Sequence, residues 1–481
     1  MSVINRYIIN PNIVLYRTND LKVVQEVRYD EFCGMINFWK MFFVEKYNAQ
    51  PGERAFIIGM PGYHYYASVF AALELGIVLI LDWPHCYSKE DLDNYKVKMF
   101  GTIDYVVCTD PDYKTAKKEY QWDQERNRRH AKNIIGIEDF LEYSIIDGTR
   151  YNEISLRMGC TPNDVAVEYP SSGTTGYPKC ITNSHHKIFT MSQRIGRMFK
   201  FKPEDTVLHL NNLNHGHGLC LHFLPGFMIS NEHYTENPAN FKRVIEFISE
   251  KKINRLLLYT AKLLTDFLNL TKQLDHPVYI LTLYQITPEI IRLLKEKNVA
   301  EINSTFGDTA IGAGFLLKTV TPATNLEHYD VANYGPKVDD FWDFEIRDGI
   351  LWVKGDTVNQ PWATSNDKFD LIENNYYFRG RADRYKIDDD WIELNELESV
   401  VRQLFDNNAN IVVDFEMQKI YIAVWKPNYI AEKQLNEYFS KQYKNAAVSY
   451  VLRDQDPAQF FNGRKIDNSK IRDYCRNRLK L

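Results

Sequence analysis

The stretch YPSSGTTGYPKCITNSHH, from Tyr169 to His186, decides how the rest of this sequence is interpreted. Its centre combines Ser and Thr hydroxyls with two glycines and a single Pro-Lys pair. Glycine lets backbone N–H groups turn toward an anion, hydroxyls add neutral donors, and Lys179 adds a positive charge. Such a loop suits a polyphosphate, although a flexible Gly/Ser linker has a similar composition. The common phosphate loop G-x-x-x-x-G-K-[ST] does not fit GTTGYPKC.

The composition of the chain indicates which class of protein it belongs to. Its 481 residues are 44% hydrophobic and 25% charged, which predicts a globular protein with more than one domain. A net charge of -5 argues against a broad basic surface, so we expect no nucleic-acid partner. The seven cysteines contain no C-x-x-C pair, and the first residues do not resemble a secretory signal. We therefore predict a cytoplasmic protein without structural zinc or disulfides.

The most apolar run, Tyr65 to Trp83, is interrupted by Glu74 and Gly76. Its charge-free parts are too short to span a bilayer, so we expect no membrane segment. Helical spacing predicts a helix over 63–75, which Gly76 ends, followed by a buried strand over 77–81.

The same alternation of strands and helices recurs along the first two thirds of the chain. Continuous apolar runs predict further strands at 55–60, 102–110 and 254–260. Periodic apolar residues predict helices at 244–253 and 287–297. Thr287 is the expected N-cap of the last helix, because Pro288 follows it. We predict an α/β fold with layered subdomains and a mainly parallel sheet.

The pattern changes after about residue 326. FEIRDGILWVKGD (344–356) predicts a hairpin that turns at Asp348-Gly349. Beyond a boundary near residues 381–384, an amphipathic helix and alternating strands predict a compact α+β unit. We expect a large domain over 1–381, with a β-rich subdomain at about 327–381, and a small domain over 382–481.

The string Ser172 to Lys179, followed by Ser184-His185, resembles the phosphate loop of the adenylate-forming superfamily. That superfamily includes acyl-CoA synthetases, peptide-synthetase adenylation domains and luciferases. Cys180 stands where the family usually has Gly. The resemblance implies that one loop binds the nucleotide phosphates, through Ser171, Ser172, Gly173, Thr174, Thr175, Gly176 and Lys179.

Further motifs follow in the family's order. LNHGHG (213–218) is similar to L-F-H-x-x-G, which implies that His215 lies by the reacting carboxylate. STFGDTA (304–310) resembles Y-G-x-T-E, which implies that Phe306 stacks on adenine and that nucleotide contacts extend over Gly307, Asp308 and Thr309, with Thr309 near the α-phosphate. KFDL (368–371) stands where the family has T-G-D-L, which implies that the ribose binds to Asp370 and Arg381.

The last motifs lie in the expected small domain. FRGRADRYKIDDDWIELNELE (378–398) looks like the family's hinge segment, which implies a hinge at Asp383 and a role for Lys386 in the second half-reaction. NGRKIDNSKIR resembles N-G-K-I-D-R-x-x-L-R with one added residue, which implies that Lys465 is the catalytic lysine. The implied fold has a large AMP-binding domain and a small mobile lid.

The resemblance implies ATP and Mg²⁺ as cofactors, and an acyl-adenylate and pyrophosphate as products. The family's acidic metal residue is Ala310 here, which leaves Asp308, or Thr175 with phosphates and water, to hold the metal. The acyl group would pass to a thiol, of CoA or of a carrier protein's pantetheine, or to an amine. Carboxylates at 388–390 would repel CoA phosphates, which favours a separate carrier protein or an amine. These departures keep open an alternative, a catalytically impaired nucleotide-binding member of the fold.

The substrate implied by the resemblance is a small carboxylic acid. Peptide-synthetase members fix an amino group with an Asp that this chain lacks beside His215, so an aryl, acyl or hydroxy acid is favoured. Leu283 and Tyr284 replace small residues of the family, which indicates a small or flat acid or a repurposed pocket.

Overall fold

A computed structural model provides the structure of the protein. It describes the residues 10–19, 22–59, 62–81, 103–109, 131–137, 139–141, 160–170, 180–210, 213, 218–235, 241–258, 261–271, 274–283, 285–308, 311–355, 362–381, 384–387, 390–405, 409–414, 419–424, 429–442, 447–451, 461–462, 465–466 and 468–478.

An eight-stranded sheet forms one layer of the described chain, in the order β14-β13-β12-β11-β9-β10-β1-β2. Its inner strands are parallel, and only the edge strands β2 and β14 run antiparallel. The strands are β1 (Val14–Asn19), β2 (Lys22–Arg28), β9 (Thr206–His209), β10 (Glu232–Thr235), β11 (Arg255–Leu257), β12 (Val278–Thr282), β13 (Val299–Asp308) and β14 (Gly312–Val320). Three amphipathic helices pack their apolar sides into one core with this sheet, namely α11 (Phe241–Glu250), α12 (Ala261–Leu270) and α13 (Pro288–Glu296).

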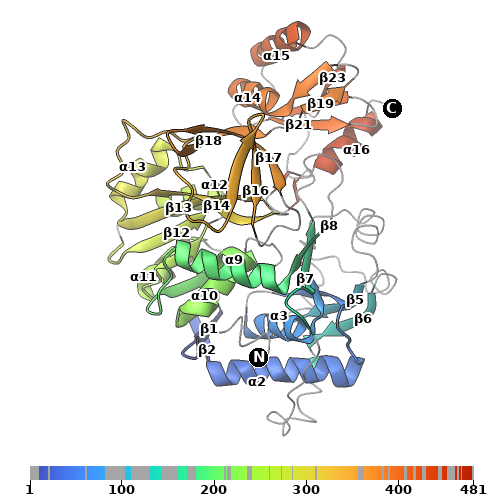
Figure 1. Ribbon diagram of the computed structural model, residues 1–481, viewed down its shortest axis with the longest axis vertical. Helices are drawn as coiled ribbons and strands as arrows, with labels where there is room; N and C mark the ends of the chain where they lie inside the picture. The colour runs from blue at the N-terminus through green and yellow to red at the C-terminus, as the bar shows by residue number, and fades with distance from the viewer. Residues whose placement is uncertain are drawn as a thin grey trace.

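A six-stranded sheet, β6-β5-β3-β4-β7-β8, forms the second layer. It is parallel except for β8, which pairs antiparallel with β7. The strands are β3 (Arg54–Ile58), β4 (Val78–Ile80), β5 (Ile103–Cys108), β6 (Ala131–Gly136), β7 (Val165–Pro170) and β8 (Cys180–Ser184). The core shared with this sheet includes residues of α2 (Tyr29–Met41), η1 (Phe42–Lys46), α3 (Tyr63–Leu75), η4 (Gly218–Phe223) and α10 (Leu224–Ile229). In Figure 1, the helices α3 and α9 (His185–Met198) lie between the strands of the two sheets. The predicted α/β class is confirmed.

The apolar run at 65–83 is two elements, as predicted. Helix α3 ends at Leu75, and Gly76 caps it in the left-handed conformation with φ 73° before β4 begins. A glycine takes this conformation without the steric cost of a Cβ atom. Among the described residues, none of the helices is both long and apolar enough to cross a membrane.

Local sequence signals also set the ends of other elements. Thr287 caps α13 as predicted, since its hydroxyl accepts a hydrogen bond from the Ile290 N–H. The predicted hairpin is formed by β15 (Asp343–Arg347) and β16 (Ile350–Lys354), which turn through Asp348 and Gly349 at φ 51° and 76°. Positive φ at both central residues matches the twist of a two-residue hairpin.

The β15–β16 hairpin is half of a four-stranded antiparallel sheet completed by β17 (Ala363–Ile372) and β18 (Asn375–Arg381). Its own apolar core contains Trp342 and Phe369 and takes in Phe315 and Leu316 of β14. The sheet is thereby attached to the end of the large sheet where β13 and β14 meet.

The last hundred residues have separate apolar clusters, in which Leu397, Ile420 and Leu435 are fully buried. Their elements are β19 (Arg384–Ile387), β20 (Asp390–Glu393), α14 (Leu394–Phe405), β21 (Ala409–Asp414), β22 (Lys419–Val424), α15 (Tyr429–Gln442), β23 (Ala447–Val451), β24 (Phe461–Asn462), β25 (Lys465–Ile466) and α16 (Asn468–Arg478). Figure 1 shows α14, α15, α16 and β21 gathered at one end of the molecule. The domain division at 381/382 stays a prediction.

Candidate functional site

The predicted phosphate loop joins the only antiparallel pair of the six-stranded sheet as described. Residues 171–179 lie outside the described residues, so the structure does not place Ser171 to Lys179. Their stems are fixed, because Pro170 pairs with Cys180 and Tyr169 pairs with Ile181. Strand β8 leads directly into α9, whose N-cap Ser184 accepts a hydrogen bond from the Lys187 N–H at 3.2 Å. The loop therefore closes one end of the β7–β8 hairpin, and α9 begins at the other end of β8, where the His185 N–H donates to the Asp164 carbonyl oxygen.

The end of β13 carries the predicted adenine segment. The half-buried Phe306 ring lies 5.1 Å from Phe369, 5.3 Å from Phe378 and 5.6 Å from Tyr334, measured between ring centroids. These rings come from the β17–β18 ribbon and the segment before β15. The site residues at the end of β13 are therefore held against the four-stranded sheet by aromatic packing.

Beyond Phe306, β13 continues to Asp308, which pairs with Gly312 of β14 after a register shift. Gly307 is exposed, and Asp308 is half-buried with its Oδ1 atom accepting a hydrogen bond from the Ile311 N–H at 3.1 Å. Thr309 and Ala310 lie outside the described residues. The turn between β13 and β14 thus fixes one oxygen of Asp308 at the end of β13.

The two predicted ribose residues do not pair across the β17–β18 ribbon. Asp370 stands opposite Tyr377, and Arg381 stands opposite Asp367, with a register shift between Lys368 and Phe369. Four residues of strand, about 13 Å, separate the Asp370 pair from the Arg381 pair.

The surroundings of the two carboxylates also differ. The Asp370 side chain is 52% exposed and forms an ion pair with Arg379 at 2.7 Å. Asp367 is buried, and its charge helps to raise the pKa of Tyr334, whose ring contacts Phe306. Asp367, which was not among the predicted site residues, is thus the β17 carboxylate near Tyr334 and opposite Arg381 in the ladder. The motif indicated Asp370, and only the strand register and the burial bring Asp367 forward.

A second group that the motifs did not indicate is buried behind the site. Lys187 is 3% exposed, and burial lowers its pKa to about 8, while Cys220 and Asp308 act in the opposite direction. Tyr169 is also buried within electrostatic reach of Cys220 and Asp308. Lys187 and Tyr169 are thus both within electrostatic reach of Cys220 and Asp308, and we call these four residues the Lys187 cluster.

The segment predicted to lie by the substrate is partly outside the described residues, His215 included. Its flanks are fixed by buried histidines, since His209 ends β9 and His222 lies in η4, with ring centroids 5.1 Å apart. His209 Nε2 lies 3.0 Å from His233 Nδ1, and His233 Nε2 lies 3.0 Å from the Ser230 carbonyl oxygen. Because a carbonyl only accepts, His233 donates from Nε2 and His209 donates to His233.

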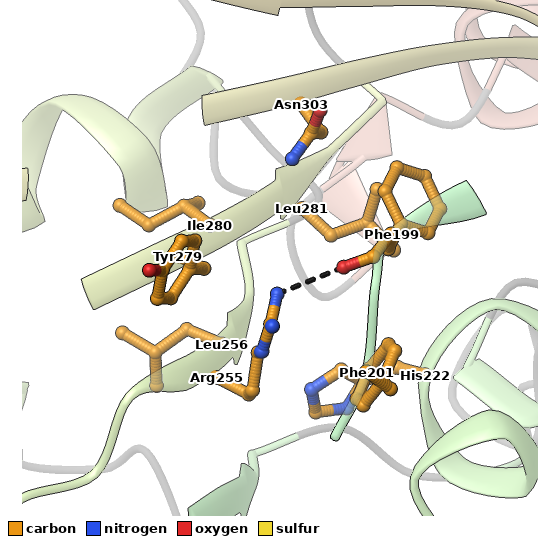
Figure 2. Close-up of a pocket in the computed structure, with 9 residues that line it drawn as sticks. All are labelled: Phe199, Phe201, His222, Arg255, Leu256, Tyr279, Ile280, Leu281 and Asn303. Carbon is orange, nitrogen blue, oxygen red and sulfur yellow. Dashed lines mark hydrogen bonds between the residues drawn. The ribbon is translucent and has the colours of Figure 1, made fainter. Parts of the chain in front are cut away.

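His222 also borders a void lined by β11, β12, β13 and the segment after α9 (Figure 2). The void measures about 10 Å³, which is room for a single water molecule. Arg255 crosses it and donates from Nη1 to the Phe199 carbonyl oxygen at 2.9 Å. This void is too small for a carboxylic acid, so it is part of the core.

The C-terminal site residues are described only by their backbones. Lys465 pairs with Asn462 in the short β24–β25 ladder, and Lys386 pairs with Trp391 in β19–β20. Asp383 lies outside the described residues. The roles predicted for these three residues stay predictions.

The described side chains do not form a protein cage for a metal ion. Within the described ranges, no group of three or more His, Cys, Asp or Glu side chains is arranged to hold one. Asp308, the acid expected to replace the residue at Ala310, already bonds a backbone N–H and lies within reach of the Lys187 charge. This donor set fits a Mg²⁺ ion held mainly by phosphate oxygens.

Comparisons with known proteins agree with this arrangement. The model of the AMP-binding enzyme family matches residues 29–336. A mitochondrial medium-chain acyl-CoA ligase of Mus musculus is 33% identical over 33% of this chain, and the match spans 27% of that relative's length. An O-succinylbenzoate-CoA synthetase from Bacillus subtilis, solved with AMP, is 15% identical with a TM-score of 0.69 and covers 98% of this chain and 97% of its own.

An anthranilate-CoA ligase solved with anthranoyl-AMP is 14% identical with a TM-score of 0.66, over 100% of this chain and 98% of its own. At these identities the two structures support the fold alone, and they cover nearly all of it. The family match extends from α2 to the segment before β15 and includes the β7–β8 hairpin and the end of β13. The chain therefore belongs to the AMP-binding enzyme family, and the predicted place in the adenylate-forming superfamily is confirmed.

Proposed function

We propose that this protein activates a carboxylic acid with ATP. A carboxylate oxygen attacks the α-phosphorus, the bond to pyrophosphate breaks, and an acyl-adenylate remains. The observation that carries the proposal is the contact of Phe306 with Phe369 and Phe378, which brings the β13 segment 306–308 against the ribbon that has Asp367 opposite Arg381. An aromatic ring packed against a strand pair that carries Asp367 and Arg381 suits an adenine with its ribose.

We assign the ribose hydroxyls to Asp367 and Arg381 in place of the pair Asp370 and Arg381. A carboxylate can accept hydrogen bonds from both hydroxyls of a ribose. Asp370 is less suited, because it is half-exposed and already paired with Arg379. Asp367 is buried and stands opposite Arg381 in the β17–β18 ladder, and we propose that these two residues serve one sugar.

The reaction brings two anions together, so positive charge is needed on both sides of the α-phosphorus. We assign Lys179 and the loop 171–179 to the leaving pyrophosphate, and Lys465 to the carboxylate and α-phosphate. Mg²⁺, when bound, would draw charge from the phosphate oxygens, with Thr175 as the nearest protein oxygen we propose.

We propose an aryl, short acyl or hydroxy acid as the substrate. Leu283, which follows β12, packs with Phe201, Met198 and Leu317 on the apolar cluster between α9 and the large sheet. That packing narrows the space beside the end of β12. A thiol of CoA, a carrier-protein thiol or an amine is the proposed acceptor, and the cytoplasmic location stays a prediction.

The decisive test is acid-dependent exchange of labelled pyrophosphate into ATP over a panel of aryl, acyl, hydroxy and amino acids. We expect exchange with one acid class, and a loss of about 100-fold or more in Lys465→Ala, which removes a charge from the transition state. The same variant should still transfer an acyl group from presynthesised adenylate to CoA or another acceptor. ATP binding without exchange on any acid would instead favour a nucleotide-binding protein that lacks catalysis.

A further inference from the structure

Arg194 of α9 is a buried cation that joins three parts of the fold. It donates from Nη1 to the Gly314 carbonyl oxygen of β14 at 2.5 Å, and from Nε and Nη2 to the Asp339 carboxylate at 2.8 and 3.1 Å. Its guanidinium carbon lies 4.2 Å from the centroid of the Trp342 ring and 5.3 Å from that of Phe341. One side chain of α9 therefore holds both β14 and the segment before β15.

The Gly314 carbonyl group belongs to an irregular stretch of β14. Between two successive pairs of the β13–β14 ladder, β13 contributes one residue and β14 contributes three, 313–315. Extra residues on one strand form a β-bulge, which bends the strand and re-aims nearby side chains. The pairs on either side of this bulge are Phe306 with Leu316 and Asp308 with Gly312. The bulge thus stands opposite Gly307, inside the segment 306–308 that we assign to the nucleotide.

The bulge is packed closely against α9. A Cβ atom added at Gly314 would lie 2.7 Å from the Ile195 side chain and 3.3 Å from Arg194 Nη1. A Cβ atom added at Gly312 would lie 3.2 Å from the Trp342 ring. The two glycines therefore let the bulge approach α9, and the hydrogen bond from Arg194 holds it there.

We propose that Arg194 is a positioning residue for the nucleotide, because its bond to the Gly314 carbonyl oxygen fixes the bulge opposite Gly307. The two bonds to Asp339 and the stacking on Trp342 hold the guanidinium in the orientation that this bond needs. Arg194 acts through the backbone of β14 and need not touch the nucleotide. The inference rests on the proposed function for the assignment of residues 306–308.

The test is the affinity for ATP and for AMP, measured by calorimetry with magnesium present, in the wild type and Arg194→Met. We expect the variant to bind both nucleotides at least tenfold more weakly, because the bulge loses its anchor. AMP lacks the pyrophosphate that we assign to the loop 171–179, so equal losses for ATP and AMP would place the effect at the end of β13. A folded Arg194→Met that binds both as the wild type does would overturn the proposal, and so would a loss for ATP that AMP does not share.

Arg194→Lys keeps the buried charge and one donor, and it decides the proposal if Arg194→Met fails to fold. An ammonium group cannot replace a guanidinium that forks onto a carboxylate and stacks on a ring. We therefore expect both nucleotides to bind about threefold more weakly, a smaller loss than in Arg194→Met. Wild-type affinities in Arg194→Lys would overturn the proposal in that case.

The matched control is Arg255, which is also buried among an aspartate, backbone carbonyl oxygens and an aromatic ring. Arg255→Lys should lower the urea midpoint of unfolding as Arg194→Lys does, but leave both nucleotide affinities within about twofold of the wild type. Equal losses of affinity in the two variants would show a general effect of stability and overturn the proposal. If the wild type binds ATP and AMP but no acid supports pyrophosphate exchange, the proposed function fails alone. If it binds neither nucleotide, both fail.

Discussion

Buried charges occur in two regions of this protein, and their surroundings differ. Behind the large sheet, Arg255 and Asp205 form an ion pair at 2.7 Å, and both are nearly inaccessible. Backbone carbonyl oxygens of Phe199 and Lys200 accept further hydrogen bonds from Arg255, and the Tyr279 ring covers its guanidinium at 4.3 Å. Near the candidate site, Asp308 is half-buried at the end of β13, and Lys187 is buried in the first turn of α9 within its electrostatic reach.

The difference separates an ion pair that holds the fold from polar residues near the segment that we assign to the nucleotide. The Arg255 pair is enclosed by its own hydrogen bonds, so its loss should change stability alone. Substitutions of polar residues near that segment should instead change the binding of ATP. The predictions below test this division, from the largest expected effect to the smallest.

Arg255→Met should lower the free energy of unfolding by about 3–5 kcal/mol, because it leaves Asp205 buried without its partner. Urea denaturation of the purified protein measures the loss. The pyrophosphate exchange rate of the folded fraction should stay within about twofold of the wild type. A large loss of exchange at full folding would show that this pair belongs to the site.

The buried histidines should make the core sensitive to acid. Burial lowers the pKa of His222 to about 3 and of His233 to about 4, and that of His209 lies well below its ordinary value. Since the unfolded chain binds more protons below pH 6.5, stability is fully present above that pH and is lost as the pH falls toward 4. Between pH 7.5 and 5.5 we expect a loss of about 1 kcal/mol for each histidine. Urea midpoints across this range should fall, and less steeply in His222→Gln.

Asp367→Asn and Asp370→Asn compare two carboxylates on one strand. Asp367→Asn should raise the KM for ATP by about 10- to 100-fold, the range for a lost charge-assisted hydrogen bond. Asp370→Asn should change it less than about threefold, because Asp370 is exposed and paired with Arg379. If pyrophosphate exchange shows that Asp370→Asn raises the KM for ATP more than Asp367→Asn does, the ribose would be assigned to Asp370.

Gly314→Ala probes how firmly α9 is held against β14 of the eight-stranded sheet. Gly314 has φ 74°, and an added Cβ atom would lie 2.7 Å from the Ile195 side chain. Its carbonyl oxygen also accepts a hydrogen bond from the buried Arg194 of α9 at 2.5 Å. We expect a loss of about 1–2 kcal/mol in the free energy of unfolding from the left-handed conformation. A variant as stable as the wild type in urea would show that the backbone of β14 relaxes around residue 314.

Local signals predicted much of this fold from the sequence. The limits of α3, the cap at Thr287 and the turn at Asp348-Gly349 depend on residues within a few positions of each other. The order of the motifs along the chain identified the superfamily. Short motifs can be compared with those of a family without knowing which residues are in contact. These features would be found in the chain without its structure.

Only the tertiary structure decided which polar residues share a site. The register shift between Lys368 and Phe369 sets Asp367 opposite Arg381. The residue pattern of β17 does not predict that shift. The burial of Lys187 likewise depends on η4 and the end of β13, which are distant in sequence. Strand register and burial are set by long-range packing, and the electrostatics of a buried group follow from its neighbours. The sequence alone therefore determined the elements and the family, and packing determined which of the charged residues are buried.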